Sequence, residues 1–364
     1  MGGGPAGLST WLHLQREDPD LATRTLLIEK AVYPRDKLCG GGVVPQADQV
    51  LCDLGIDLHV PSVPIQHFDY VFGPNRLHWS PGNAFRVVRR YEFDHALARA
   101  AVERGLTLNE GEAFRRFERE GRRLVVETTR GRYRVRALIG ADGASSLVRR
   151  AMNLRERPRM SRLLEVVTPV LSQNPPDAVS DTAVFDFSPV AQGLQGYVWH
   201  FPCLVAGVPS FNRGIFDSRV YADRVPAKLN KVFEEALKGR APFAFAQPSM
   251  WSAHPERWFD PQGMYAQPNV LLVGDAAGVE PTFGEGISYA LRYGAVAAKY
   301  LVQSFQRSDF SFRDYRDRLL ASPMGMALFF QTITARQMYA DAPDALEQLH
   351  RRFAQELGAE SSPR

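Results

Sequence analysis

The residues most suited to binding a phosphate ligand stand at the start of the chain. Gly2, Gly4 and Gly7 have the spacing G-x-G-x-x-G, with Pro5 and Ala6 between the last two. In a dinucleotide-binding fold, the first glycine permits a tight strand-to-helix turn. The second lets the backbone approach a pyrophosphate, and the third lets the helix pack closely on the strand. The helix then presents free N–H groups and a positive dipole end to the phosphates.

An acidic residue follows this motif at the expected distance. The apolar run Leu26-Leu27-Ile28 predicts a strand that ends at Glu29, 22 residues after Gly7. A carboxylate there can accept hydrogen bonds from both hydroxyls of an adenosine ribose. The alternative is an ordinary turn followed by a surface glutamate. Two later motifs disfavour that alternative because they point to the same ligand.

The glycine motif has one defect. A turn of this kind follows a strand, but almost no chain precedes Gly2, and Met1 stands where the last apolar residue of that strand should be. We expect that the start is misassigned or that the chain is a fragment. One hypothesis is a GTG codon, which is translated as Val inside a gene and as Met at a start. The intact mass of the native protein tests this hypothesis.

Two later segments place an aspartate where a buried strand ends. The strand expected at residues 137–140 runs into Asp142, and the strand expected at residues 269–273 runs into Asp275. In open α/β sheets a cofactor crevice lies at the carboxyl ends of the strands. Asp275 can bind the hydroxyls of a ribityl chain, and the helix expected after Gly286 would stabilise negative charge on a reduced flavin ring. A capped turn alone would explain Asp142, but not its occurrence with the other motifs.

A loop and a helix start offer further polar and reactive groups. Prolines and glycines make residues 33–42 a loop, whose cations could face phosphates and whose glycines would let the backbone approach a flat group. Cys39 in this loop is either a small buried filler or a thiol near a reacting centre, and the residues alone favour the filler. Arg90 opens a predicted helix, where it either reaches a phosphate or ribityl oxygen or lies on the surface.

One predicted strand carries a row of aromatic side chains. Alternate side chains of a strand share a face, so Tyr197, Trp199 and Phe201 would line up, with Val198 and His200 on the opposite face. The row could line a cavity for a planar or hydrophobic ligand, although such rows more often only pack within the sheet. A lone histidine is more often a structural residue than a general acid.

Length and composition limit the class of protein that can carry these candidate site residues. The 364 residues can bury a large core, and we expect two interleaved domains. The net charge of +4, with arginines spread along the chain, predicts no nucleic-acid partner. Three cysteines without metal-ligand spacing predict no metal site and a reducing, cytoplasmic setting. No apolar run approaches membrane-spanning length. The apolar stretch 324–330 is either core packing, which we favour, or a lipid-facing surface.

Together the motifs resemble a known family. The glycine turn with Glu29 and the strand ends at Asp142 and Asp275 resemble the flavoprotein monooxygenase superfamily of the aromatic-hydroxylase fold. Residues 34–41 fit P-x-x-K-x-C-G-G and residues 197–202 fit Y-x-W-x-F-P, and both patterns are similar to the geranylgeranyl reductase branch of that superfamily. The resemblance spans residues 2 to about 305.

The resemblance implies a bound FAD and an α/β fold. A Rossmann-like FAD-binding domain would be interleaved with an antiparallel β-sheet substrate domain and followed by a helical C-terminus. The FAD-binding domain, with its first strand missing, would comprise residues 1–60, 85–160 and 265–305; the substrate domain residues 61–84 and 161–264; and the C-terminal helices residues 306–364.

The resemblance also assigns roles to individual residues. It gives Cys39, Tyr197 and Trp199 as the catalytic residues, and it implies no metal ligand. The cofactor residues are Gly2, Gly4, Pro5, Ala6, Gly7, Glu29, Lys30, Lys37, Cys39, Gly40, Arg90, Ala113, Asp142, Gly143, Gly274, Asp275, Pro281, Gly284, Gly286 and Ile287.

Family members reduce isolated carbon–carbon double bonds of prenyl chains on diphosphates, archaeal-type lipids, quinone side chains or (bacterio)chlorophylls. By this resemblance NAD(P)H or reduced ferredoxin reduces the FAD, and the flavin N5 delivers a hydride to one alkene carbon. Cys39, Tyr197 or an ordered water gives a proton to the other carbon. The partners would be a hydrophobic prenyl-type substrate and, for a ferredoxin-type donor, an electron-donor protein. Peripheral membrane contact would suit such a substrate.

Two alternative functions remain open at this point. One is an aromatic or polyketide hydroxylase that uses O₂ on the same scaffold. The other is a flavin-binding or lipid-carrier protein without turnover. A halogenase is disfavoured because the pattern W-x-W-x-I is not found: Trp199 is followed by Phe201-Pro202.

Overall fold

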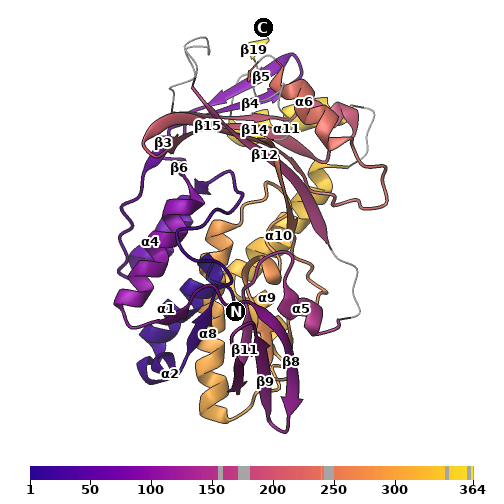
Figure 1. Ribbon diagram of the computed structural model, residues 1–364. Coiled ribbons are helices and arrows are strands. Elements are labelled where there is room, and N and C mark those ends of the chain that lie inside the picture. Colours follow the sequence, from indigo (N-terminus) through magenta and orange to yellow (C-terminus); the bar gives the residue numbers. More distant parts are fainter. Residues whose placement is uncertain are drawn as a thin grey trace.

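The structure is a computed structural model that describes residues 1–154, 159–170, 181–238, 240–241, 250–340, 344–358 and 362–363. Figure 1 shows two parts, one above the other. The lower part holds short parallel strands between helices and a small antiparallel sheet, and a large antiparallel sheet forms the upper part.

Short apolar runs form the parallel strands of the lower part. Strand β1 (Leu26–Ile28) pairs in parallel with β7 (Thr107–Asn109), and β11 (Leu138–Gly140) pairs in parallel with β18 (Val270–Leu272). Strand β17 (Ala266–Gln267) adds to β18 in the antiparallel direction. All three residues of β18 are buried, as expected for a strand that is covered on both faces.

Two helices cross on one side of these strands. They are α1 (Pro5–Glu17) and α8 (Ile287–Arg307). The Ser9 hydroxyl donates a hydrogen bond to the Leu291 carbonyl (2.6 Å), and a Cβ added at Gly294 would overlap Ser9. The helices therefore meet backbone to backbone, and the glycine in α8 is what permits this approach.

A small antiparallel sheet covers the other side of the parallel strands (Figure 1). Its order is β10–β9–β8, with β8 at Phe114–Glu120, β9 at Arg123–Thr128 and β10 at Arg132–Val135. Strands β9 and β10 form a hairpin. Most of the seven residues of β8 are charged and exposed.

The upper sheet has eight strands in the order β16–β12–β15–β14–β13–β4–β5–β19. Among the described strands of this sheet, β13 and β4 alone pair in parallel. The strands are β4 (His67–Phe72), β5 (Asn75–Trp79), β12 (Met160–Pro169), β13 (Thr182–Asp186), β14 (Gly196–Val205), β15 (Val208–Asp217), β16 (Ser252–Arg257) and β19 (Ser362–Pro363).

The two faces of this sheet pack on different helices. Val198 on one face packs against α6 (Leu229–Leu237). Tyr197 and Phe201 point to the other face and share a core with residues of α11 (Ala345–Leu357). The alternation expected for the aromatic row is therefore confirmed.

The remaining elements connect these layers. A three-stranded sheet in the order β2–β6–β3 lies between the two parts. The remaining elements are β2 (Gly42–Val43), β3 (Ser62–Ile65), β6 (Phe85–Val88), α2 (Pro19–Thr23), α3 (Pro45–Asp53), α4 (Arg90–Glu103), α5 (Leu147–Ala151), α9 (Tyr315–Ala321) and α10 (Pro323–Met338).

The mixed α/β class with antiparallel sheets and C-terminal helices is confirmed. Strands β4 and β5 form a hairpin that turns at Gly73, where φ is +64°. Among the C-terminal helices, Pro323 cannot continue α9 and instead begins α10. In the described part of the chain, no helix is long and apolar enough to cross a membrane.

Candidate active site

The glycine turn has the geometry that its spacing predicts. Gly2 has φ +101°, and a Cβ there would overlap the Ala141 carbonyl oxygen; a Cβ at Gly7 would overlap the Gly2 carbonyl oxygen. Gly4 differs, since the nearest atom to a Cβ there is an Arg35 guanidinium nitrogen at 3.9 Å. Gly4 is the N-cap of α1, Pro5 begins the helix, and no side chain caps this end. The first-turn N–H groups of α1 thus face a space that suits a phosphate.

Glu29 lies beside this turn, as predicted. Its buried carboxylate accepts hydrogen bonds from the Gly3 N–H (2.7 Å) and the Ala31 N–H (3.0 Å). The next residue, Lys30, is exposed. Ala113 lies at the same edge, because the N–H of its neighbour Glu112 donates to the Glu29 carbonyl (2.9 Å).

Arg90 does not lie free at the surface. It is buried, and its guanidinium makes two hydrogen bonds to Asp94, at 2.6 and 2.7 Å. The Arg35 guanidinium approaches the same carboxylate at 3.1 Å and the Glu29 carboxylate at 3.7 Å. Arg35 is therefore the cation of the 33–42 loop that stands beside the open face of Gly4.

Asp142 caps a helix in this structure. Its carboxylate accepts hydrogen bonds from the Ser146 hydroxyl (2.5 Å) and from the Leu147 and Val148 N–H groups (2.7 and 3.1 Å), all at the start of α5. Gly143, with φ +82°, makes the turn between β11 and that helix. The structure thus gives Asp142 a structural role, and its contact with a cofactor stays a prediction.

The chain that follows β18 packs directly against the glycine turn. A Cβ added at Gly274 would lie 2.6 Å from the Ala6 side chain. The next residue, Asp275, approaches the Lys37 ammonium at 4.0 Å. Lys37 in turn lies 2.6 Å from the His254 imidazole. Burial, followed by the Lys37 charge, lowers the pKa of His254 to about 4, so the imidazole is neutral and accepts this hydrogen bond.

Gly284 and Gly286 lie close to a buried acid. Cβ atoms at these glycines would lie 2.8 and 3.4 Å from the Glu256 carboxyl oxygens, and the one at Gly286 would lie 3.8 Å from Asp275. The flanking Pro281 and Ile287 are buried, and Ile287 begins α8. Backbone groups at the start of α8 and the carboxyl groups therefore surround one space.

Glu256 is the clearest sign that a polar group belongs in that space. Its Oε2 is buried and has no hydrogen-bond partner among the described residues. Burial, and then the charges of Asp275 and Glu280, raises its pKa well above the usual value, which favours the protonated carboxyl. A buried polar atom without a partner is costly. The polar edge of a flavin ring would satisfy it.

The loop and the aromatic strand predicted to flank the reacting centre are in contact. A Cβ at Gly40 would lie 3.5 Å from the Trp199 indole nitrogen. Trp199 donates to the Asn212 side-chain oxygen (2.8 Å), and the Asn212 amide donates to the Cys39 carbonyl (2.9 Å) and to Glu165 (3.1 Å). Cys39 is half-buried, and its thiol accepts the Gly41 N–H at 3.4 Å.

Tyr197 lies next to this cluster, but its hydroxyl is already engaged. It donates to the Phe283 carbonyl at 2.5 Å, and burial raises its pKa well above the usual value. The neighbouring Thr282 is also held, since its carbonyl accepts a hydrogen bond from Tyr339 (2.9 Å) and its hydroxyl donates to the Gln331 carbonyl (2.9 Å). The segment that leads to Gly284 is thus fixed by the large sheet and by α10.

The family comparison identifies the ligand that this space fits. A protein family described as an FAD binding domain matches residues 1–311. The chain belongs to this family. It is an FAD-dependent oxidoreductase, and the family expected from the motifs is confirmed.

Two curated relatives and one solved structure are similar over most of the chain. An uncharacterized protein of Methanosarcina barkeri is 30% identical over 324 residues, covering 85% of this chain and 75% of its own. A menaquinone reductase of Mycobacterium tuberculosis is 30% identical over 314 residues, covering 83% of this chain and 75% of its own. A geranylgeranyl bacteriochlorophyll reductase-like protein of Thermoplasma acidophilum superposes with a TM-score of 0.71 at 18% identity, covering 98% of this chain and 97% of its own.

The structure brings together residues that fit FAD. The N-terminal turn of α1, with Gly4 and Arg35, would hold the pyrophosphate, and Glu29 would bind the ribose. Asp275 and the start of α8 would hold the ribityl chain and the ring. Within the described ranges, no group of three or more His, Cys, Asp or Glu side chains could hold a metal ion.

Sequence reasoning missed three polar residues of this site: Glu165, Asn212 and Glu256. Each stands inside a strand of the large sheet and is buried. Burial raises the pKa of Glu165 to about 7, although Arg89, at 3.5 Å, opposes this. A charged or amide residue in the middle of a buried strand is unusual, and that was the available signal.

The role of Glu256 leads to a prediction. Glu256→Gln keeps a hydrogen-bond donor and should bind FAD within about twofold of the wild type. Glu256→Leu removes the donor and should weaken binding about tenfold, the value of one buried hydrogen bond. Titration of the apoprotein with FAD, followed by flavin fluorescence, measures both. Equal affinity of the Leu variant and the wild type would contradict the role, provided that both unfold at the same temperature.

Proposed function

We propose that this protein reduces carbon–carbon double bonds in the prenyl chain of a hydrophobic substrate. The observation that carries the proposal is the contact between the Cys39–Gly40 loop and the aromatic wall of Trp199 and Phe201, made through Asn212. This contact holds the backbone of Cys39 and Gly40 against the aromatic wall, which supports a role for this loop next to the residues that fit FAD. The relation to a menaquinone reductase supports a substrate with a prenyl chain.

The chain's own residues would bind the alkene, exclude water and supply a proton. Bound FAD, reduced by NAD(P)H or a reduced ferredoxin, supplies a hydride to one alkene carbon. We assign the proton for the other carbon to the Cys39 thiol, whose thiolate regains a proton from solvent. Tyr197 is the weaker candidate because its side chain is buried and its hydroxyl already donates to the Phe283 carbonyl.

Peripheral contact with a lipid surface belongs to the same proposal. On α10, Met324 and Leu328 are buried, whereas Met326, Phe329, Phe330 and Ile333 are exposed. The exposed residues are spaced i, i+3, i+4 and i+7, so they share one side of the helix. Core packing, which the sequence favoured for residues 324–330, accounts for only part of the stretch. The exposed stripe supports access to a membrane-borne prenyl substrate.

An anaerobic spectrum tests the proposed reaction. The FAD-loaded protein is reduced with dithionite and mixed with geranylgeranyl diphosphate or menaquinone. We expect the oxidised flavin bands to return with a saturated product, and not to return with a fully saturated prenyl analogue. Bands that return only after oxygen is admitted, with a hydroxylated product, would favour the hydroxylase. Bands that return with no prenyl compound would contradict the proposal.

A further inference from the structure

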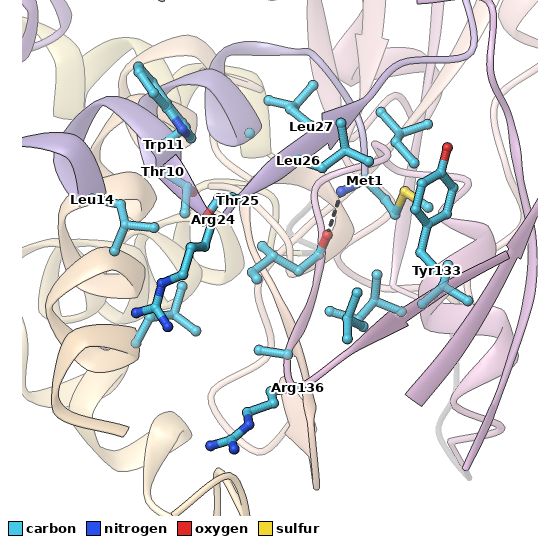
Figure 2. A pocket seen from close by; sticks show the side chains of 18 of the residues that line it. Met1, Thr10, Trp11, Leu14, Arg24, Thr25, Leu26, Leu27, Tyr133 and Arg136 are labelled. Atoms are coloured by element: carbon cyan, nitrogen blue, oxygen red, sulfur yellow. Dashed lines mark hydrogen bonds between the residues drawn. The ribbon is translucent and has the colours of Figure 1, made fainter. Parts of the chain in front are cut away.

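A buried glutamate links the two parts of the molecule. Glu165 lies in the middle of β12, in the upper sheet, and is only 5% exposed. It interacts with Arg89 at the N-cap of α4 and with Cys39 in the loop before β2. These three residues do not line the cavity of about 740 Å³ that Figure 2 shows beside Met1 in the lower part. The Glu165 cluster is a separate feature, at the junction of the two parts.

The backbone of Cys39 is held at both of its polar groups. The Glu165 carboxylate accepts a hydrogen bond from the Cys39 backbone N–H, and the Asn212 amide donates to the Cys39 carbonyl (2.9 Å). Asn212 also donates to Glu165 Oε1 (3.1 Å), so the two side chains that hold the loop are bound to each other. The Arg89 guanidinium approaches the same oxygen at 3.5 Å. The large sheet therefore supplies fixed partners for both the N–H and the carbonyl of Cys39.

The acid and the aromatic wall belong to one face of the sheet. Trp199, Gly214 and Glu165 are register partners on β14, β15 and β12, so their side-chain positions share a face. A Cβ at Gly214 would overlap the Trp199 indole, so the ring lies over that position. The indole N–H donates to Asn212, two residues along β15 (2.8 Å). Glu165 is thus joined through Asn212 to the ring against which Gly40 packs.

Packing alone does not explain a glutamate at this position. Replacing a buried ion pair with apolar side chains of similar volume is often neutral or stabilising. The ion pair with Arg89 adds little, because the Arg89 side chain is 21% exposed and solvent screens the attraction. The hydrogen bond to the Cys39 N–H, by contrast, is one that an apolar residue could not make. The energetics therefore favour a role for Glu165 in placing the loop.

We propose that Glu165 is a positioning residue that fixes the orientation of Cys39 relative to the aromatic wall. Glu165 takes the N–H of Cys39 and Asn212 takes its carbonyl, so Cys39 cannot turn about its own backbone without breaking both contacts. The carboxylate itself takes no part in making or breaking a bond. The kinetic effect rests on the proposed function, because the loop affects the reaction through the proton that we assign to Cys39.

The charge of Glu165 makes this hold dependent on pH. Burial raises its pKa to about 7, although the Arg89 charge and the hydrogen bonds from Cys39 and Asn212 act in the opposite direction. These hydrogen bonds favour the ionised carboxylate, so Cys39 is held more strongly above pH 7 than below it. Cys203 of β14 also interacts with Glu165, but burial raises its pKa to about 11, so its thiol is neutral over this range.

Hydrogen exchange across residues 37–43 of the FAD-loaded protein measures the hold without any substrate. After correction for intrinsic exchange, we expect protection of the Cys39 amide to rise by about tenfold between pH 6 and pH 8. Glu165→Leu should lose this protection while keeping its FAD and its melting temperature. Glu165→Gln should recover part of it, because its amide oxygen can still accept a hydrogen bond, but without the pH dependence.

The same variants have an expected kinetic effect. In Glu165→Leu, reoxidation of the reduced flavin by a prenyl substrate should slow by about 100-fold, the cost of misplacing a reacting group by about 1 Å. Asp186→Asn is the matched control. Asp186 is a carboxylate of the same sheet that accepts the Ser188 backbone N–H (2.9 Å), and its replacement should change neither the exchange at Cys39 nor the rate.

Three outcomes would overturn the proposal. They are unchanged protection of Cys39 in Glu165→Leu, the same loss of protection in Asp186→Asn, and a pH dependence that persists in Glu165→Gln. Loss of FAD from Glu165→Leu would also overturn it, since Glu165 would then act on cofactor binding. A wild-type flavin that no prenyl compound reoxidises would contradict the proposed function instead, and the exchange at Cys39 would still decide whether Glu165 holds the loop.

Discussion

Replacing Gly7 with alanine should abolish FAD binding. The added Cβ would overlap the carbonyl oxygen of Gly2, and neither backbone can move without opening the turn that meets Ala141. The helix must then tilt away from the strand end, and its first N–H groups leave the phosphate position. We expect FAD affinity to fall by more than about 100-fold, since several charge-assisted hydrogen bonds are lost together. Flavin content after purification and titration with FAD measure the loss.

Two further glycine variants separate folding from ligand binding. A Cβ at Gly4 meets only the end of the Arg35 side chain, so Gly4→Ala should fold with an unchanged melting temperature. It should still weaken FAD binding, because the methyl group stands where the pyrophosphate approaches. Gly131→Ala meets nothing within 4 Å and should change neither property. If Gly7→Ala retained its flavin, the assignment of this turn to the pyrophosphate would be wrong.

Replacing Cys39 with alanine should leave FAD bound but slow reoxidation of the flavin by a prenyl substrate. The Cys39 carbonyl accepts a hydrogen bond from Asn212, which also binds Trp199, so the thiol belongs to the loop that is held against the aromatic wall, and we assign the proton to it. Loss of a positioned general acid typically slows a reaction by about 10²–10⁴-fold. Single-turnover absorbance after anaerobic mixing measures the rate, and Cys39→Ser should recover part of it because a hydroxyl can still donate.

Cys52 provides the matched control. It is exposed and lies on α3, so Cys52→Ala should leave both FAD content and reoxidation unchanged. An unchanged rate in Cys39→Ala would remove the thiol from the reaction and leave an ordered water as the proton donor. A lost rate together with lost flavin would instead show that Cys39 positions the cofactor.

Local patterns predicted the parts of this protein that depend on neighbours in the sequence. The spacing of Gly2, Gly4 and Gly7 fixed the turn, and the apolar run before Glu29 fixed the strand end. The alternation of Tyr197, Trp199 and Phe201 fixed the aromatic face, because a strand has a period of two. In each case the physical cause lies within a few residues of the chain.

The sequence could not show which polar groups pair across the fold. Glu256 approaches Gly284 from β16, and Asn212, which binds Trp199, reaches the Cys39 carbonyl 173 positions away along the chain. Nor could the sequence show that Arg90 pairs with Asp94, four residues along its own helix; the contact of Arg90 with a cofactor stays a prediction. Asp142 is a second example, because its carboxylate accepts hydrogen bonds from the first residues of α5. Such choices depend on the burial and charge of surrounding elements.

The hydrogen bonds that hold Thr282 and Phe283 affect how long FAD should stay bound. Tyr197, Tyr339 and Gln331 hold Thr282 and Phe283 from two sides. A site that is already ordered loses little conformational entropy when its ligand arrives. Because it is held from two sides, this segment also resists swinging open to let the ligand leave. Exchange of FAD should therefore wait for partial unfolding between α10 and the large sheet, and loss of the yellow colour on heating should coincide with loss of tertiary structure.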